Sequence, residues 1–299
     1  MAGVITRSNH PSALWPGVKA FFGLKYKEHP AEWSQIFEKG DSDKYQERVV
    51  EATTFGLAPQ KAEGASLQYD TDSEGYTTYF THVVYGLGYV VTREEMEDNL
   101  YAEVSNRRAR NLAFSMKTTA EIVHANVLNT AFTATSGDGA ALISASHPTL
   151  SGNQSNLLTA ADLSETAIED ALKVQMQAKN NRGLRIALRT ARLIIPTDET
   201  FNAQRILKSE LRQGTANNDI NAIKALGSIP EITINHYLTD SDAWFLQTDV
   251  PDGMMSYWRR EVALEKDNDF DTENAKAKAT MRFSAGVADW RAIYGSTGV

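Results

Sequence analysis

The sequence predicts an α+β protein, and three features of the chain support this prediction. Residues 93–133 contain no Gly and no Pro, which favours one helix of about 40 residues, near 60 Å long. A polar, β-rich hairpin pattern precedes this helix at residues 64–85. After Ser164, strand and helix patterns alternate, which is typical of a compact subdomain around a central sheet.

The composition excludes several classes of protein. With 42% hydrophobic and 23% charged residues, the chain of 299 residues can bury a core and should fold. It contains no cysteine, which excludes disulfides, zinc-thiolate sites and iron-sulfur clusters. No apolar run approaches the ~20 residues that cross a bilayer, so we expect a cytosolic protein without a cleaved leader or a membrane partner. The net charge of -8 argues against tight coating of nucleic acid.

The N-terminal segment, residues 1–38, combines many aromatic side chains with three prolines. The prolines, Pro11, Pro16 and Pro30, argue against one long helix, whereas the aromatic side chains need burial. We therefore predict an extended arm whose aromatic residues pack against another surface. That surface belongs either to a neighbouring molecule or to the same domain. The aromatic residues of this segment are Trp15, Phe21, Phe22, Tyr26, Trp33 and Phe37.

Two β-rich segments follow the arm. Residues 48–55 have strand composition, and residues 64–70 and 75–85 flank a polar turn at 71–74. The hairpin has few aliphatic positions before Val83, so it cannot form a core of its own. We expect it to lie on a neighbouring element, in this chain or another, and an ordinary surface hairpin is the alternative.

The long helix begins with a capping box, because Thr92 is followed three residues later by Glu95. Its apolar residues recur mostly every four positions, so the stripe drifts round the helix and does not form a coiled-coil seam. We predict a spine that other layers cover. The residues predicted to form its buried stripe are Met96, Leu100, Val104, Leu112, Met116, Val123 and Val127.

The second half of the chain predicts a subdomain followed by terminal strands. Helices are expected from Ser164 to Gly183 and from Thr197 to Leu207. The predicted strands cover residues 191–195, 231–237, 243–247, 255–266, 275–287 and 290–294.

Motifs for catalysis or metal binding are incomplete. The six histidines do not form the spaced pair with a glutamate that a zinc protease needs, and the acidic turns at 70–75 and 267–271 lack calcium-loop ligands. Asp138 and His147 could act as acid and base, but no nucleophile in a recognisable setting accompanies them. The sequence therefore predicts no catalytic residue, no cofactor and no metal site.

Several segments, in order, resemble the major capsid proteins of tailed bacteriophages, especially the major head subunit of Mu-like phages. They are the aromatic arm, the polar hairpin, GLGYVVTREEMEDNLY (86–101), GDGAALISASHP (137–148) and MRFSAGVADWRAIYG (281–295). The resemblance implies the Hong-Kong-97-like capsid fold. It divides the chain into an N-terminal arm (1–45), a strand and E-loop hairpin (46–91), a P-domain spine helix with the following loop (92–149), an A-domain with a central sheet (150–254) and P-domain terminal strands (255–299).

The same resemblance implies a function. The chain would form the hexamers and pentamers of an icosahedral shell around a double-stranded DNA genome, with a separate scaffolding protein, a portal, a decoration protein and only weak, nonspecific contact with DNA. Assembly would take place in the host bacterial cytoplasm and the mature location would be the virion. We expect noncovalent shells, with the loop at 213–221 or the turn near Asp240 at the capsomer axis. The residues expected to contact neighbouring subunits are Trp15, Phe21, Phe22, Tyr69, Tyr76 and Tyr79.

Two alternatives remain at this point. An encapsulin-like compartment has the same fold but encloses cargo enzymes. A soluble α/β enzyme would need a convergent acid-base site, which the sequence does not contain.

Overall fold

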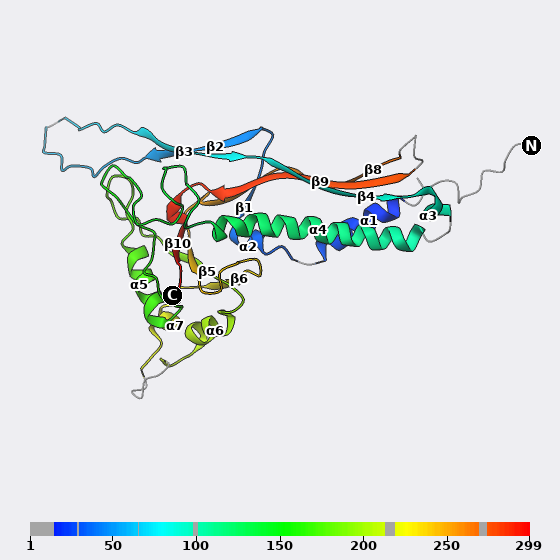
Figure 1. Cartoon of the computed structure of the whole chain (residues 1–299). Helices are drawn as coiled ribbons and strands as arrows, with labels where there is room; N and C mark the ends of the chain where they lie inside the picture. The colour runs from blue at the N-terminus through cyan, green and yellow to red at the C-terminus, as the bar shows by residue number, and fades with distance from the viewer. Residues whose placement is uncertain (1–14, 29, 65, 98–100, 213–218, 269–273) are drawn as a thin grey trace, which may run out of the picture.

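The computed structural model describes residues 15–28, 30–64, 66–97, 101–212, 219–268 and 274–299 (Figure 1). A long sheet and the helix α4 form an extended body, a hairpin projects from one end, and a second, mixed layer lies below that end. The helices are α1 (Trp15–Lys27), α2 (Trp33–Ile36), α3 (Arg93–Glu97), α4 (Tyr101–Asn129), α5 (Glu165–Met176), α6 (Thr200–Lys208) and α7 (Ala222–Leu226). The strands are β1 (Glu38–Asp41), β2 (Gln46–Thr53), β3 (Ser73–Thr81), β4 (Val83–Val91), β5 (Thr190–Ile195), β6 (Glu231–Ile234), β7 (Trp244–Thr248), β8 (Met254–Asn268), β9 (Ala275–Val287) and β10 (Ile293–Ser296).

The long sheet has the strand order β1-β8-β9-β4. β9 pairs antiparallel with both β8 and β4, and β1 pairs parallel to β8. Buried and exposed residues alternate along the first half of β9, so its small and apolar side chains face one side and its basic ones the other. The side chains on the buried side are Ala275, Ala277, Ala279, Met281 and Phe283.

Helix α4 covers the apolar face of this sheet. Leu112 and Met116 are buried between helix and sheet, at 4% and 2% exposure, whereas Phe114 on the opposite side is 64% exposed. The small alanine side chains of β9 leave room for α4 to lie close to the sheet. Helix α1 lies along α4 and contributes Phe22 to the same core (Figure 1).

An aromatic stack around His124 joins α4, α2 and the sheet. The imidazole ring lies 4.5 Å from the ring of Trp33 and 5.1 Å from that of Phe283. Its Nδ1 lies 2.6 Å from the Ala120 carbonyl oxygen, so Nδ1 carries the proton and Nε2 accepts from the Ser256 hydroxyl at 2.7 Å. Burial, opposed by the Ala120 hydrogen bond, lowers the pKa of His124 to about 4.

The second sheet has the order β10-β7-β5-β6 and forms a separate core with α5 and α6. β5 and β7 are buried along most of their length, which agrees with the apolar runs at residues 193–195 and 244–246. Ser164 caps α5 by accepting a hydrogen bond from the Ala167 N–H, at 3.2 Å. A central sheet and two helices are thus present in this part of the chain, but α5 ends at Met176 and not at Gly183, and α6 begins at Thr200 and not at Thr197.

The projecting hairpin consists of β2 and β3, which pair only with each other in the described part of the chain. β3 continues almost directly into β4, and the single residue between them, His82, marks the change of partner from β2 to β9. The His82 ring is held on both sides, with Nε2 2.9 Å from the Ser42 hydroxyl and Nδ1 3.0 Å from the Ser284 hydroxyl.

The structure corrects the prediction of an extended arm, because residues 15–27 form a helix. Pro16 is the second residue of α1, where a missing N–H and a fixed φ are tolerated. Trp33 and Phe37 are buried in the chain's own core, which agrees with the alternative that the arm packs on its own domain.

The prediction of one continuous spine helix is also wrong. The Arg108 guanidinium lies 2.9 Å from the Glu95 carboxylate, although 13 residues of continuous helix would separate them by about 20 Å along the axis. α3 and α4 are therefore two helices in contact with one another. The helix also ends at Asn129 and not at residue 133.

Two strand assignments differ from the prediction. The partner of β3 is β2, and the described residues 64 and 66–70 belong to no strand, so the two strands are connected by residues 54–72. At the C-terminus, a short 3-10 helix (Trp290–Ala292) precedes β10, which pairs with β7. The predicted segment 255–299 is thus divided between the two sheets, just as the predicted segment 46–91 is divided between hairpin and long sheet.

Replacing Leu112 by Ala should lower the free energy of unfolding by about 2–5 kcal/mol, because it leaves a cavity between α4 and β9. Urea denaturation of the soluble chain measures the loss. Phe114→Ala on the exposed side of the same helix is the matched control and should change stability by about 0.5 kcal/mol or less. Equal losses for both variants would contradict the burial described above.

His124 should make the fold sensitive to acid. The pKa of His124 is about 4 in the folded chain, whereas an ordinary imidazole has a pKa of 6.5, so the unfolded chain binds more protons between these values. The stabilisation is complete above pH 6.5 and should fall by about 3 kcal/mol as the pH drops to 4. Denaturant titrations at pH 7, 5.5 and 4 should show this loss in the wild type and a smaller loss in His124→Gln. An equal loss of stability with falling pH in the wild type and in His124→Gln would contradict this role of His124.

Candidate intersubunit surface

A buried arginine fixes the base of the hairpin. The side chain of Arg291 is 4% exposed, and its guanidinium lies 2.9 Å from the Glu51 carboxylate on β2. It also donates to the Asn181 side-chain oxygen at 2.6 Å and to the Lys179 carbonyl at 3.1 Å. One side chain thus joins the hairpin, the loop after α5 and the C-terminal segment.

The charges around Arg291 keep it ionised despite its burial. Burial acts to lower the pKa of Arg291, but Asp289 and Glu51 outweigh it and raise the pKa above its ordinary value. A buried cation with two anionic partners holds its geometry firmly, because removing one partner would leave an uncompensated charge.

The loop after α5 makes further contacts with the hairpin. The Asn180 amide donates to the Thr54 hydroxyl at 2.7 Å, and the Arg182 guanidinium donates to the Thr71 carbonyl at 2.8 Å. The loop of the hairpin is closed by Asp70, whose carboxylate accepts hydrogen bonds from the N–H groups of Gly56 and Thr71. These bonds hold the pKa of Asp70 below its usual range.

Glycine packing completes the rigid base. A Cβ atom at Gly137 would collide with the Thr78 hydroxyl, and one at Gly286 would lie 3.0 Å from the Phe80 ring. β3 therefore crosses the loop after α4 and the end of β9 at distances that only glycine permits.

The far end of the hairpin has the opposite character. Leu57 and Tyr69 are 81% and 89% exposed, and Phe55 and Leu67 are exposed beside them. These four residues, here called the hairpin tip, line a hollow of about 710 Å³ between residues 55–62 and residues 66–70 of the loop. Apolar side chains gathered at the end of a projecting element are suited to contact with another molecule.

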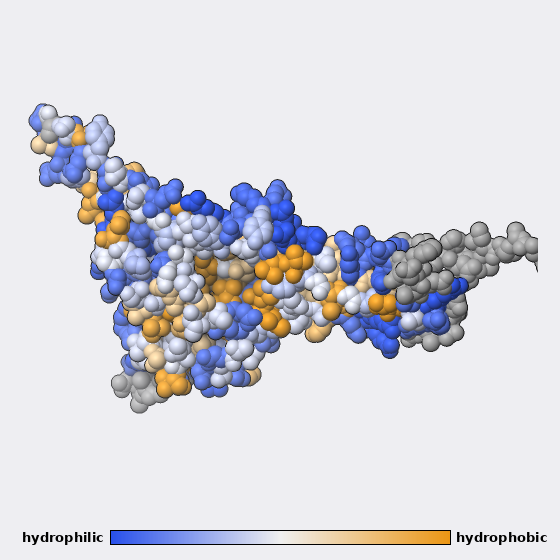
Figure 2. Space-filling view, turned by 45° about the horizontal axis from the view of Figure 1, so that its top comes forward, coloured by the Kyte–Doolittle hydropathy of each residue, from blue (hydrophilic) through white to orange (hydrophobic). Residues whose placement is uncertain are grey.

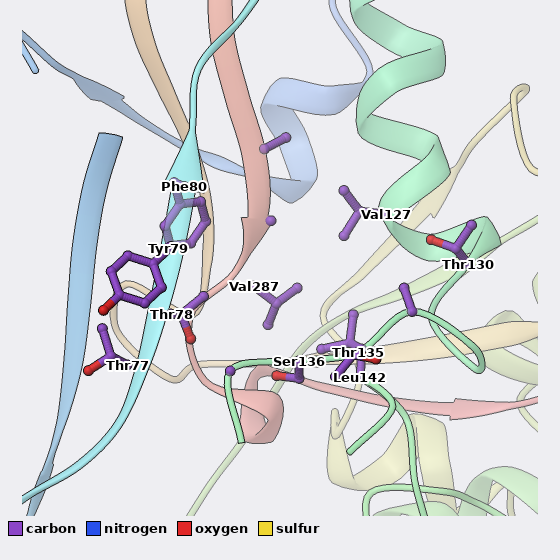
Figure 3. Close-up of a pocket in the computed structure, with 14 residues that line it drawn as sticks. Thr77, Thr78, Tyr79, Phe80, Val127, Thr130, Thr135, Ser136, Leu142 and Val287 are labelled. Carbon is purple, nitrogen blue, oxygen red and sulfur yellow. The ribbon is translucent and has the colours of Figure 1, made fainter. Parts of the chain in front are cut away.

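A second hollow, of about 600 Å³, lies between the hairpin and the body (Figure 3). β3 lines one side with residues 77–80, and the end of α4 lines the other with Val127 and Thr130. Leu142 and Val287 contribute apolar surface, and no charged side chain lines the hollow. It is suited to an uncharged, partly apolar segment.

The six residues predicted to contact neighbouring subunits fall into three groups. Tyr69 and Tyr79 are exposed, at 89% and 58%. Phe22 is 4% exposed because it packs in its own chain, so it is not available to a neighbour, and the Tyr76 hydroxyl is buried without a hydrogen-bond partner. Burial raises the pKa of Tyr76 well above its ordinary value. The side chains of Trp15 and Phe21 lie outside the described residues.

The residues of the predicted spine stripe are only partly described. Leu112 and Met116 are buried, and Val123 and Val127 are partly buried against the same core. The side chains of Met96 and Val104, and the whole of Leu100, lie outside the described residues.

Asp138 and His147, which the sequence analysis considered as an acid and a base, lie in contact as a buried pair. The His147 ring lies 2.6 Å from the Asp138 carboxylate, and it stacks on Trp290 at 4.3 Å. Its other nitrogen contacts the Asn156 side-chain oxygen at 3.0 Å, and the Asn156 amide nitrogen donates to three backbone carbonyls. Both partners are almost fully buried, so this network holds loops together and is closed to a substrate.

Among the residues that the structure describes, no cluster of three or more His, Asp or Glu side chains could hold a metal ion. No described helix is long and apolar enough to cross a membrane.

Several solved structures are similar to this fold. Three solved structures similar to the chain are a virus-like particle from Pyrococcus furiosus, a structure of Mycobacterium phage Che8 and the capsid of Myoviridae phage XM1. Their TM-scores are 0.55, 0.53 and 0.52, at 10%, 14% and 11% identity. They cover 94%, 89% and 100% of this chain, and 98%, 92% and 100% of their own chains. These likenesses confirm the Hong-Kong-97-like fold.

No curated protein matches the sequence significantly. The family model described as phage capsid protein matches residues 75–296, which is well over half of the chain. The matched region includes α4, the strands β4, β8 and β9 of the long sheet and the whole second sheet, and it leaves out β1 and β2. The chain therefore belongs to the phage capsid protein family.

Proposed function

We propose that this chain is the major capsid protein of a tailed double-stranded DNA bacteriophage and assembles into the hexamers and pentamers of an icosahedral shell. Membership of the phage capsid family makes it a structural protein and not an enzyme. One observation carries the proposal: a projecting hairpin, fixed at its base by Arg291, presents an apolar tip that its own chain does not bury.

The physical logic of a shell fits this arrangement. The hairpin tip gains burial only on another subunit, and symmetry repeats each modest contact many times. A rigid base sets the direction in which the tip points, so that every copy reaches the same place on its neighbour. Figure 2 shows hydrophobic surface over the middle of the body.

The partners in this proposal follow from the same role. A separate scaffolding protein would direct assembly, a portal would occupy one vertex, and a decoration protein would bind outside. The net charge of -8 favours weak, nonspecific contact with packaged DNA. The axial contact is proposed for the turn near Asp240 or the loop at 213–221, of which residues 213–218 lie outside the described residues. Assembly is proposed for the host cytoplasm and the final location is the virion capsid.

An encapsulin-like compartment is the alternative function. The likeness to the virus-like particle from Pyrococcus furiosus supports a shared fold alone, at 10% identity. The match to the phage capsid family model favours the phage shell.

Electron microscopy and light scattering of the purified full chain test the proposal. Closed shells or rings of capsomers are the expected result. A chain that stays monomeric near 33.0 kDa at every concentration, with or without the phage's scaffolding protein, would contradict it.

The hairpin tip should be needed for assembly and not for folding. The triple variant Leu57→Ser, Leu67→Ser, Tyr69→Ser should keep its thermal transition, because exposed substitutions change stability by about 0.5 kcal/mol or less. The yield of sedimenting particles should fall by about tenfold or more, since large apolar side chains dominate such contacts. Leu150→Ser, at 65% exposure in a different loop, is the control and should assemble normally. Normal shells from the triple variant would remove the tip from the interface.

A further inference from the structure

In the part of the chain that the structure describes, the strand β4 forms an unprotected edge of the long sheet. It pairs with β9 over its full length, and no described strand covers its other side. Its sequence, VVYGLGYVV, contains no charged residue and no proline. Val84 and Leu87 are 53% and 51% exposed, so apolar side chains accompany the free backbone. Natural sheets protect such edges, and an unprotected one is suited to pairing with another strand.

The opposite edge of the same sheet shows the contrast. β1 covers only the first part of β8, at residues 255–258. Beyond this point β8 carries charged side chains, which discourage pairing along an edge. They are Arg259, Arg260, Glu261, Glu265, Lys266 and Asp267. The protection is therefore selective, and β4 is the edge left open.

The outward backbone groups of β4 can be assigned. The Val90 carbonyl oxygen accepts a hydrogen bond from the Arg108 guanidinium at 3.0 Å, which indicates that it points away from β9. In an antiparallel pair, every second residue of a strand bonds to the partner strand, and the residues between point their N–H and C=O groups away from it. The outward groups of β4 therefore belong to Val84, Gly86, Gly88 and Val90. A carbonyl oxygen has two lone pairs, so Val90 can accept a second bond beside that of Arg108.

The sequence of β4 reads the same in both directions about Leu87. If two copies pair antiparallel across a two-fold axis through Leu87, each residue meets its own type: Val84 faces Val90, Tyr85 faces Tyr89, and Gly86 faces Gly88. In this register the outward groups of both strands face each other in hydrogen-bonded pairs, and Leu87 meets Leu87 in a non-hydrogen-bonded pair. A two-fold interface requires this self-complementarity.

We propose that β4 is a homotypic interaction surface, which pairs with β4 of a second copy of this chain across a two-fold axis at Leu87. The long sheets of two subunits would thereby become one continuous sheet. The inference rests on the proposed function only in that copies of the chain come together. A partner strand of another kind, such as the hairpin of a neighbour, would not place the two Leu87 residues side by side.

Cysteine crosslinking tests the two-fold axis, since the wild-type chain has no cysteine. In Leu87→Cys, the two Cα atoms of a non-hydrogen-bonded pair would lie about 4.5 Å apart, within the range of a disulfide. In Val84→Cys, which is equally exposed, the two cysteines would lie about 20 Å apart along the strands. After mild oxidation, we expect a disulfide-linked dimer of Leu87→Cys and about tenfold less of Val84→Cys.

The crosslinking is measured on sedimented particles and on the soluble fraction separately, by non-reducing gels and by mass spectrometry of the linked peptide. Equal, low crosslinking of the two variants in particles would overturn the β4 pairing and leave the shell function intact. A specific Leu87→Cys dimer without particles would support the pairing although the shell function failed. Equal crosslinking in the absence of particles would overturn both.

Charge variants test the register. In Val84→Lys with Val90→Lys, each lysine would face a lysine of the second copy, whereas in Val84→Lys with Val90→Glu, each lysine would face a glutamate. Placed in the Leu87→Cys chain, the first pair should reduce the dimer by about tenfold, and the second should keep it within about twofold. Both pairs occupy the same two half-exposed positions. Equal losses in the two backgrounds would overturn the proposed register.

Discussion

The packing of α4 against β9 is the constraint on which the rest of the structure depends. The helix approaches closely because β9 presents alanines along the first part of its buried face, followed by Met281 and Phe283. This layer fixes the long sheet, and the sheet in turn fixes β4, the start of the hairpin and the surface that receives α2. The His124 stack closes the layer at one end, so the three parts of the chain that meet there cannot shift independently.

Local patterns were sufficient to predict much of this architecture. The alternation of residues 275–287 predicted β9 with its observed bounds, and the helix start predicted at Ser164 agrees with α5, which begins at Glu165. Strand β5 and the two long terminal strands followed from apolar runs and alternation in the same way. These predictions were correct because the sequence pattern that indicates each element lies within about a dozen neighbouring residues.

The errors arose where distant residues decide the structure. The break between α3 and α4 is visible only through the Glu95–Arg108 contact, and the partner of β3 lies some thirty residues upstream in β2. Arg291 escaped notice for the same reason, because its partners Glu51 and Asn181 are far away in the sequence. Of the predicted contact residues, Tyr69 and Tyr79 are exposed and Phe22 is not, and aromatic character alone does not distinguish these cases.

The continuity of β3 and β4 has a mechanical consequence. A pull on the hairpin tip passes through His82 into β4 along the backbone, because one strand serves both elements. The load then acts parallel to the β4–β9 ladder, so its hydrogen bonds share the force and must fail together, unlike a ladder that is peeled open bond by bond. Tension between subunits would thus be carried in shear by the longest sheet of the molecule, while the contacts of Ser42 and Ser284 with His82 hold the strand in line.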